Sequence, residues 1–198
     1  MNKNALRLEA RKRRLNLSPI NQTKSASALV VQLRRLPVYR RATNIAFYIA
    51  NDGELNPSLA LKQALMRKKC CYLPCLTTRN SMIFRRYTPN TRMIPNIYNI
   101  LEPQPRAASI PAVRLDVVLL PLVAFDRKGN RLGMGGGFYD RTFDFKRRFN
   151  PRKPVLVGLA HSIQEVDSLP TNDWDVPLDY VVTEKDVFKR RGNWSGNV

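Results

Sequence analysis

Four glycines within five residues mark the part of the chain that could hold a phosphate. Gly133 and the run at 135–137 follow an apolar stretch, residues 117–125, that is typical of a buried strand. Closely spaced glycines can adopt positive φ angles and let the backbone approach a ligand. If a helix begins near Phe138, its free N–H groups and its dipole favour an anion in the loop. The pattern predicts a nucleotide-phosphate loop, although a tight structural turn would use the same residues.

Charged residues stand on both sides of this loop. Arg131 and Arg141 bracket it, where guanidinium groups can make paired hydrogen bonds to phosphate oxygens. Either could instead pair with a surface carboxylate. Asp140 would be unfavourable beside a bare phosphate, but it fits if Mg²⁺ lies between the two groups.

Two common phosphate loops are excluded by spacing. A Walker loop requires Gly-Lys followed by Ser or Thr, which occurs nowhere in the chain. A dinucleotide-binding loop that starts at Gly133 would place its third glycine at position 138, which is Phe138.

The longer motif resembles a known family. Residues 121–126 (Pro-Leu-Val-Ala-Phe-Asp) and 131–141 (Arg-Leu-Gly-Met-Gly-Gly-Gly-Phe-Tyr-Asp-Arg) are similar to the signature of the 5-formyltetrahydrofolate cyclo-ligase (methenyltetrahydrofolate synthetase) family. Further similarities follow in family order: Lys-x-x-x-Arg at residues 3–7, Asn-Asp-Gly-Glu at 51–54 and Asp-Val-Pro-Leu-Asp at 175–179. The resemblance implies an enzyme that uses ATP and Mg²⁺ to close 5-formyltetrahydrofolate to 5,10-methenyltetrahydrofolate, with release of ADP and phosphate.

The resemblance also implies which residues bind ATP. Lys3 and Arg7 are four residues apart, so on a helix they share one face and can contact the same phosphate tail; without the resemblance, a solvated basic face is the simpler interpretation. Arg131 and Arg141 are expected to stabilise the transferring phosphate as catalytic residues. The full expected ATP-binding set is Lys3, Arg7, Arg131, Gly133, Met134, Gly135, Gly136, Gly137, Phe138 and Tyr139.

Folate and metal ligands are expected at other positions. Glu54, at the end of a predicted strand, can accept paired hydrogen bonds from the pterin, with Ile49 as an apolar wall. The aromatic residues expected to stack on the folate are Tyr98, Phe138 and Tyr139. The expected Mg²⁺ ligands are Asp140 and Asp175, with Asp173 and Asp179 close enough in sequence to leave the second choice open.

One departure from the family pattern concerns cations in the loop. Many members have Lys at the place of Gly136 and Arg at the place of Met134, and this chain has neither. Other cations or the metal must then neutralise the phosphate, or activity is lower. A paralogue that keeps ATP binding but uses another substrate therefore remains an alternative.

The chain carries 34 basic and 15 acidic residues, a net charge of +19. Such an excess raises nucleic acid as a partner, but the basic residues are dispersed and Arg11-Lys-Arg-Arg14 is the only run of four. We expect ATP and a folate, possibly with a polyglutamate tail, as partners, and a basic nucleic-acid-binding protein as the alternative. Drift of composition is the favoured explanation for most of this charge, and electrostatic steering of polyanions for a few of the residues.

The cysteine pattern and the lack of a long apolar segment favour a cytoplasmic enzyme. His161 is the single histidine, and because the expected chemistry needs no imidazole base we interpret it as structural. Cys70, Cys71 and Cys75 lack zinc-site spacing and read as a buried strand with reduced thiols. No apolar run approaches the ~20 residues that span a membrane, and the basic N-terminus lacks the apolar stretch of a secretory signal. We expect a monomer.

Strands alternate with helices along the chain, which predicts a single α/β domain over residues 1–198 with a mostly parallel β-sheet and helices on both faces. Residues 88–112 are rich in proline and are expected to form a loop, and the basic tail at 187–198 is expected to be flexible, with no core to join. The expected helices span 3–15, 19–36, 57–69 and 138–149, and the expected strands 44–50, 70–73, 82–87, 116–121, 154–160 and 179–182.

Overall fold

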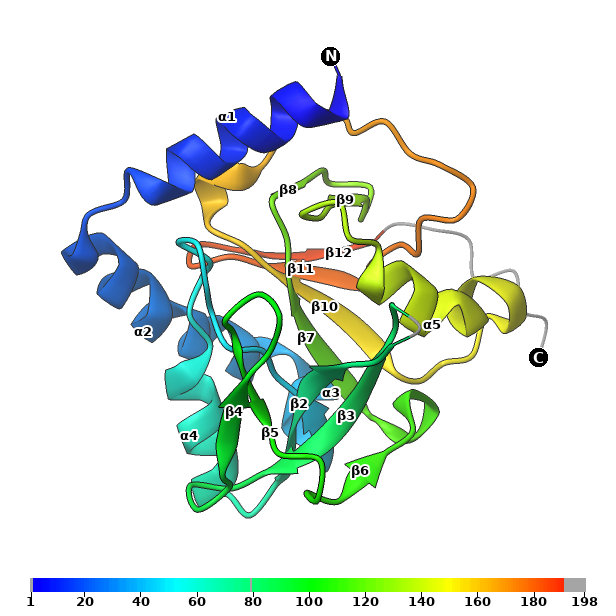
Figure 1. The fold of residues 1–198 in the computed structure, drawn as a ribbon. Helices are drawn as coiled ribbons and strands as arrows, with labels where there is room; N and C mark the ends of the chain where they lie inside the picture. Colours follow the sequence, from blue (N-terminus) through cyan, green and yellow to red (C-terminus); the bar gives the residue numbers. More distant parts are fainter. Residues whose placement is uncertain (1, 79, 191–198) are drawn as a thin grey trace.

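The computed structural model describes residues 2–78 and 80–190, which form one α/β domain around a central sheet (Figure 1). The helices are α1 Lys3–Leu15, α2 Pro19–Arg35, α3 Pro37–Arg41, α4 Ser58–Met66 and α5 Phe138–Phe149, with 3-10 turns η1 Ala112–Arg114 and η2 Ser162–Gln164. The strands are β1 Asn44–Ala46, β2 Cys70–Leu76, β3 Met82–Tyr87, β4 Met93–Pro95, β5 Leu101–Pro103, β6 Ser109–Ile110, β7 Val117–Pro121, β8 Ala124–Phe125, β9 Arg131–Leu132, β10 Val155–Leu159, β11 Tyr180–Val182 and β12 Val187–Lys189.

Within the described residues the central sheet has eight strands, in the order β12-β11-β10-β7-β1-β2-β3-β6. The strands from β11 to β2 run parallel, and β12, β3 and β6 join antiparallel at the edges. The central strand β7 is apolar throughout and buried over Val117–Leu120, because helices cover both faces of a parallel sheet. The predicted fold class is confirmed.

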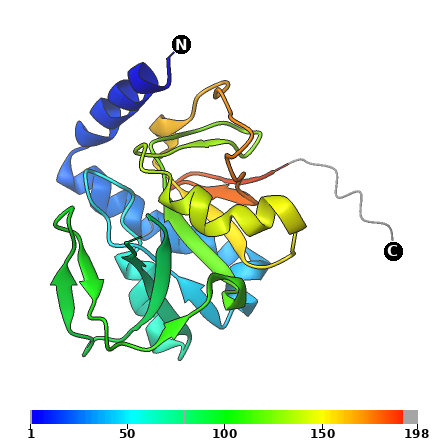
Figure 2. The ribbon, with the colours of Figure 1, turned by 45° about the vertical axis from the view of Figure 1, so that its right-hand side comes forward.

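The two faces of the sheet carry different helices (Figure 2). On one face Leu29 and Leu33 of α2 and Leu61 of α4 pack with Phe47 against the sheet. On the other face Phe143 of α5 packs with the opposite side chains of β7 and β10. Each face therefore has its own core, and α5 is fixed directly after the glycine loop.

Helix α1 packs at the carboxyl ends of the parallel strands rather than on a face of the sheet (Figure 1). Leu6 and Ala10 are buried there against Val123 and Leu132. The spacing of Leu6 and Ala10 puts them on one side of the helix. The basic residues at the start of α1 are thereby brought to the strand ends.

Three expectations about the elements are corrected. Strand β1 ends at Ala46 rather than residue 50, since the chain leaves the ladder to form the site. Residues 88–112 contain the β4–β5 hairpin and β6. Val187–Lys189 form β12 on the edge of the sheet, and Phe188 packs against the core, so the tail does join the core there. Residues 191–198 lie outside the described residues.

Helix α3 is not among the predicted elements, because the predicted helix ends near residue 36 and residues 37–41 are assigned no element. Pro37 opens α3, and its fixed φ suits the first position of a helix. None of the helices in the described part of the chain is both long and apolar enough to cross a membrane.

Candidate active site

The site lies where the order of the sheet reverses. In the sheet, β2 is the neighbour of β1 on one side and β7 is its neighbour on the other side. After β7 the chain continues to β10, which lies farther from β1 in that second direction. Ligands of open α/β sheets bind beyond the carboxyl ends of the strands at such a switch point. Here the segments after β1 and after β7 both open into one cleft.

The cleft has a volume of about 1100 Å³, large compared with the ~300–1,000 Å³ of most small-molecule sites. Its walls come from the start of α1, the turn after β1, the β4–β5 hairpin and the glycine loop. The structure places every residue predicted for the site in this lining: Lys3, Arg7, Ile49, Glu54, Tyr98, Arg131, Gly133, Met134, Gly135, Gly136, Gly137, Phe138, Tyr139, Asp140, Arg141 and Asp175.

The glycine loop leads directly into α5. Gly135 and Gly137 have φ angles of 103° and 63°, where side chains other than glycine are disfavoured. Gly137 is the residue before the first turn of α5, and no side chain of the described residues caps that turn. Its N–H groups are therefore available to an anion in the cleft.

Two arginines shape the loop through its carbonyl groups. Arg7 donates from Nε to the Gly133 carbonyl at 2.9 Å. Arg141 donates to the Gly136 carbonyl and to the Asn80 carbonyl, and its guanidinium lies over the Phe138 ring, 5.4 Å from the centroid. Both cations thus sit beside the loop.

Arg131 is buried and already paired, although its position beside the glycine loop suggests a free cation. Its side chain is only 7% exposed, and Nη2 lies 2.5 Å from Oδ1 of Asp140. Arg131 also donates to the Val176 carbonyl, while the Val176 N–H donates to the same Asp140 oxygen. Burial lowers the pKa of Arg131, and the neighbouring carboxylates oppose this. The residue predicted to contact phosphate and the residue predicted to bind metal are therefore paired with each other.

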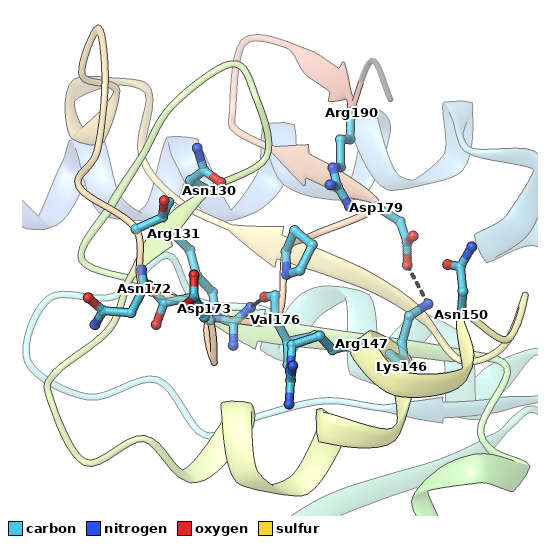
Figure 3. Close-up of a pocket in the computed structure, with 13 residues that line it drawn as sticks. Asn130, Arg131, Lys146, Arg147, Asn150, Asn172, Asp173, Val176, Asp179 and Arg190 are labelled. Carbon is cyan, nitrogen blue, oxygen red and sulfur yellow. Dashed lines mark hydrogen bonds and ion pairs between the residues drawn. The ribbon is translucent and has the colours of Figure 1, made fainter. Parts of the chain in front are cut away.

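A second, smaller pocket of about 410 Å³ shares Arg131 with the main cleft, and Figure 3 shows the residues that line it. Asp173 and Asp179 line this pocket but not the main cleft, whereas Asp175 lines both. Asp179 is engaged by Lys146 at 3.0 Å and by the Leu156 N–H. Of the three carboxylates, Asp175 is the one placed to act in the main cleft.

Lys3 reaches from α1 to the loop that carries Asp175. Its Nζ lies 3.3 Å from Oδ2 of Asp175, and the Asn172 N–H donates to the same oxygen. This ion pair fixes α1 against the loop before strand β11.

Asp140 and Asp175, the expected Mg²⁺ ligands, both line the main cleft. Asp140 and Asp175 each use one oxygen for the contacts above, and within the described residues the other oxygen of each accepts no hydrogen bond. Residues 2–78 and 80–190 contain no group of three or more His, Cys, Asp or Glu that could hold a metal. Mg²⁺ usually takes one or two carboxylates with phosphate oxygens, which is the donor set this cleft can complete.

Glu54 belongs to a tight turn after β1, with its Oε2 accepting from the Asn51 N–H at 3.1 Å. Burial raises the pKa of Glu54 to about 7, while the Asn51 N–H and Arg14 oppose the shift. The Tyr139 hydroxyl is also near this carboxyl group, and burial followed by the charge of Glu54 raises the pKa of Tyr139. Glu54 and the aromatic residues after the glycine loop therefore share one corner of the cleft.

Aromatic side chains form the wall opposite the strand ends. Tyr98, in the turn between β4 and β5, meets Phe138 edge to face with ring centroids 6.1 Å apart. Tyr139 stacks on the buried Phe143 at 6.4 Å. Tyr98 and Phe138 thus face the cleft from different segments, while Tyr139 is anchored in the core.

Sequence reasoning missed several residues of the site. Trp174 lines the cleft with 64% of its surface exposed, and Arg11 and Arg14 hold Asp52 in the turn of Glu54. The run at 11–14 was considered only as a nucleic-acid signal. Trp174 directly precedes Asp175 in the sequence. This position next to an expected metal ligand is the one sequence feature that points to Trp174 as a site residue.

His161 and the cysteines lie outside the cleft lining. His161 is buried at the end of β10, and both ring nitrogens lack a partner among the described residues. Burial lowers its pKa, which favours the neutral imidazole. The three cysteines are free and lie in β2, and burial raises the pKa of Cys71 and Cys75 to about 12.

Comparisons with known proteins agree with this architecture. A model of the 5-formyltetrahydrofolate cyclo-ligase family matches residues 1–184. The chain is 42% identical to the 5-formyltetrahydrofolate cyclo-ligase of Haemophilus influenzae over 176 residues, covering 87% of this chain and 92% of that protein. It is 37% identical to the Escherichia coli K12 enzyme of the same name, covering 90% and 98%.

A solved structure shows the same fold. The NMR structure of Aquifex aeolicus 5,10-methenyltetrahydrofolate synthetase superposes with a TM-score of 0.84 at 30% identity, covering 100% of this chain and 97% of that one. The fold and the site define an α/β protein with a glycine-rich loop at the switch point of its sheet. Within that class, the chain belongs to the 5-formyltetrahydrofolate cyclo-ligase family.

Proposed function

We propose that this protein catalyses the ATP-dependent cyclisation of 5-formyltetrahydrofolate to 5,10-methenyltetrahydrofolate, with release of ADP and phosphate. One observation carries the proposal: a single cleft contains both the glycine loop and the Glu54 turn. Its volume suits two ligands lying side by side. The family membership of the chain supports the same activity.

The nucleotide phosphates occupy the glycine loop in this proposal. The uncapped N–H groups of α5 bind the phosphate oxygens, and Lys3, Arg7 and Arg141 supply positive charge around them. Phosphoryl transfer depends chiefly on positioning and on neutralising charge, so a nucleophilic side chain is not required.

The folate lies with its pterin at Glu54. An ionised carboxylate there accepts hydrogen bonds from the amino group and the ring N–H, while Ile49 provides an apolar wall. Tyr98, Phe138 and Tyr139 offer aromatic surface to the rest of the folate. This places the 5-formyl group toward the loop.

The chemistry then proceeds between the two bound ligands. The formyl oxygen attacks the γ-phosphorus, and the bond from that phosphorus to the bridging oxygen of ADP breaks. N10 attacks the formyl carbon, loses its proton, and the carbon–oxygen bond breaks to release phosphate. The role of the protein is to align these atoms and to stabilise charge on the transferring group.

In this scheme Arg131 acts through Asp140, which it contacts directly. Its guanidinium orients the Asp140 carboxylate through the 2.5 Å contact, so we assign it a positioning role in addition to its charge. Asp140 and Asp175 are the residues that would hold Mg²⁺, which neutralises phosphate charge when bound.

An absorbance assay tests the proposed activity. Formation of 5,10-methenyltetrahydrofolate from 5-formyltetrahydrofolate should require both ATP and this protein, and the methenyl product has its own absorbance band. If no methenyl product forms with ATP, while the protein still binds nucleotide, the alternative of a paralogue with another substrate is correct.

Other features of the enzyme remain predictions. We expect a cytoplasmic monomer that accepts folates with polyglutamate tails. The family assignment disfavours nucleic-acid binding as the main role. Heparin or RNA affinity should therefore be weak at moderate salt.

A further inference from the structure

Arg14 is a fully buried charged side chain, with 0% of its surface exposed. A buried guanidinium is costly unless its N–H groups find acceptors. Arg14 does not line the cleft, but it lies next to the turn that carries Glu54. The contacts of its guanidinium show which parts of the site it holds in place.

Three of its donor groups reach two segments of the site. Nε donates to the Asp52 carbonyl at 2.7 Å and Nη2 to Asp52 Oδ2 at 2.6 Å, while Nη1 donates to the Leu122 carbonyl at 3.1 Å. Nη2 also lies 3.9 Å from the sulfur of Met134 in the glycine loop. A single side chain of α1 therefore joins the turn after β1, the end of β7 and the glycine loop.

The turn that Arg14 holds is strained. Asp52 and Gly53 have φ angles of 50° and 73° in succession, a conformation that a residue with a side chain adopts at a cost. Glu54 follows directly, so its direction depends on this turn. Arg11 holds the same Asp52 carboxylate, but its side chain is 39% exposed.

We propose that Arg14 is a positioning residue that sets the Glu54 turn against the end of β7 and thereby controls folate binding. The inference rests on the folate role proposed above for Glu54. Lysine cannot replace it, because an ammonium group lacks the planar set of donors that reaches Asp52 and Leu122 together.

The charge of Arg14 also acts on Glu54 directly. Among the groups around Glu54, the charge of Arg14 lowers the pKa of Glu54 and the charge of Asp52 raises it. The charge of Glu54 in turn raises the pKa of Tyr48 and of Tyr139. Loss of positive charge at position 14 should move the ionisation of Glu54 to higher pH.

Arg14 also faces His161, whose pKa its charge lowers further. The neutral state of His161 follows mainly from burial. Neither ring nitrogen of His161 has a hydrogen-bond partner among the described residues, so His161 shares no acceptor with Arg14.

The test measures direct binding of 5-formyltetrahydrofolate and of MgATP, separately, by calorimetry. Arg14→Lys should weaken folate binding by about tenfold to a hundredfold, the scale of a small misplacement in a site, and change MgATP binding less than threefold. Arg14→Met should do the same and also move the pH midpoint of folate binding upward. Arg13→Met removes the same charge from the same helix, at a side chain paired with the exposed Glu9, and should bind both ligands like the wild type.

Several outcomes would overturn the proposal: wild-type folate binding in Arg14→Lys, equal weakening of both ligands, or an equal loss in Arg13→Met. If the Arg14 variants do not fold, Asp52→Asn tests the same link from the other side. It should weaken folate binding while sparing MgATP, and unchanged folate binding in it would refute the role. Because the readout is binding, a wild type that binds folate but gives no methenyl product would reject the proposed function and leave the Arg14 test valid.

Discussion

At the scale of single residues, burial raises the pKa of Glu54, whereas the proposed pterin contact requires this carboxyl group to be ionised. Because its pKa is raised to about 7, it is partly protonated at neutral pH. A protonated carboxyl group offers one acceptor fewer and a donor that the pterin cannot use. Folate binding at this position therefore depends on pH.

We predict that the KM for folate falls as pH rises through 7, and that Glu54→Gln removes this dependence. Above that pH the variant should lose about 2–5 kcal/mol of binding, a rise in KM of roughly thirtyfold or more, with little change in the KM for ATP. Steady-state kinetics across the pH range gives both values. A folate KM that is unchanged in Glu54→Gln would remove Glu54 from the site.

The same shift has a consequence for stability. The folded pKa of Glu54 lies above its usual 4.5, so the native state binds the proton more tightly than the unfolded chain does. The stability that this contributes is present below pH 4.5 and is lost as pH rises through 7. We expect the unfolding temperature of the free enzyme to fall over this interval, and to fall less in Glu54→Gln, as thermal denaturation would show.

Asp140 pairs with Arg131 and is the proposed Mg²⁺ ligand, so one substitution tests both. Asp140→Ala should abolish turnover and should also leave the buried Arg131 without its carboxylate. Because Asp140 is 26% exposed, the cost should be about 1–3 kcal/mol, below that of breaking a fully buried pair.

Turnover and thermal denaturation measure the two effects of Asp140→Ala separately. Glu165→Ala is the control for stability, since its partner Arg127 is 73% exposed and the pair should contribute little. Activity in Asp140→Ala with normal Mg²⁺ dependence would show that the metal is held elsewhere.

At the scale of elements, the glycine loop packs closely against the ring of Phe138. Gly136 does not have a positive φ, so its backbone would accept another residue. A Cβ at this position would lie 2.7 and 2.8 Å from two atoms of the Phe138 ring. The absence of a lysine here is therefore coupled to the placement of the aromatic wall.

We predict that Gly136→Lys displaces Phe138 and raises the KM for folate by up to about tenfold, the order of a lost aromatic contact. Gly136→Ala adds the Cβ without the charge and is the matched control. An equal rise in both variants assigns the effect to the ring. A higher kcat in Gly136→Lys alone would show that the phosphate gains from the added cation, whereas wild-type folate KM in both would contradict the steric argument.

At the scale of the whole molecule, the chain has a net charge of +19, and its two proposed ligands are both polyanions. Long-range attraction raises the encounter rate and is screened by salt. The ion pairs at the cleft are local and do not remove this field.

We predict that kcat/KM for both substrates falls about threefold to tenfold from low to high salt, while kcat at saturation changes little. Steady-state kinetics in a neutral salt series measures this, and a nonionic osmolyte at equal osmolarity is the control. Salt independence of kcat/KM would leave drift of composition as the explanation of the charge.

Local patterns in the sequence were sufficient for the elements with their own signals. Ser18 and Pro19 predict the start of α2 because they supply a capping oxygen and a fixed φ. The apolar run at 117–121 predicts a central strand. The glycine-rich motif and the family resemblance predict site residues that all line the cleft, but not Trp174, which lines it too.

Only the tertiary structure decided how those residues are paired. Arg131 and Asp140 are separate predictions in the sequence, yet burial between α5 and Val176 brings them to 2.5 Å. Arg14 reads as part of a basic run, whereas packing of α1 over the strand ends buries it against the turn of Asp52. Local spacing determines which groups a segment can offer, and the contacts among distant segments determine which of them meet, because each buried charge must find its acceptor there.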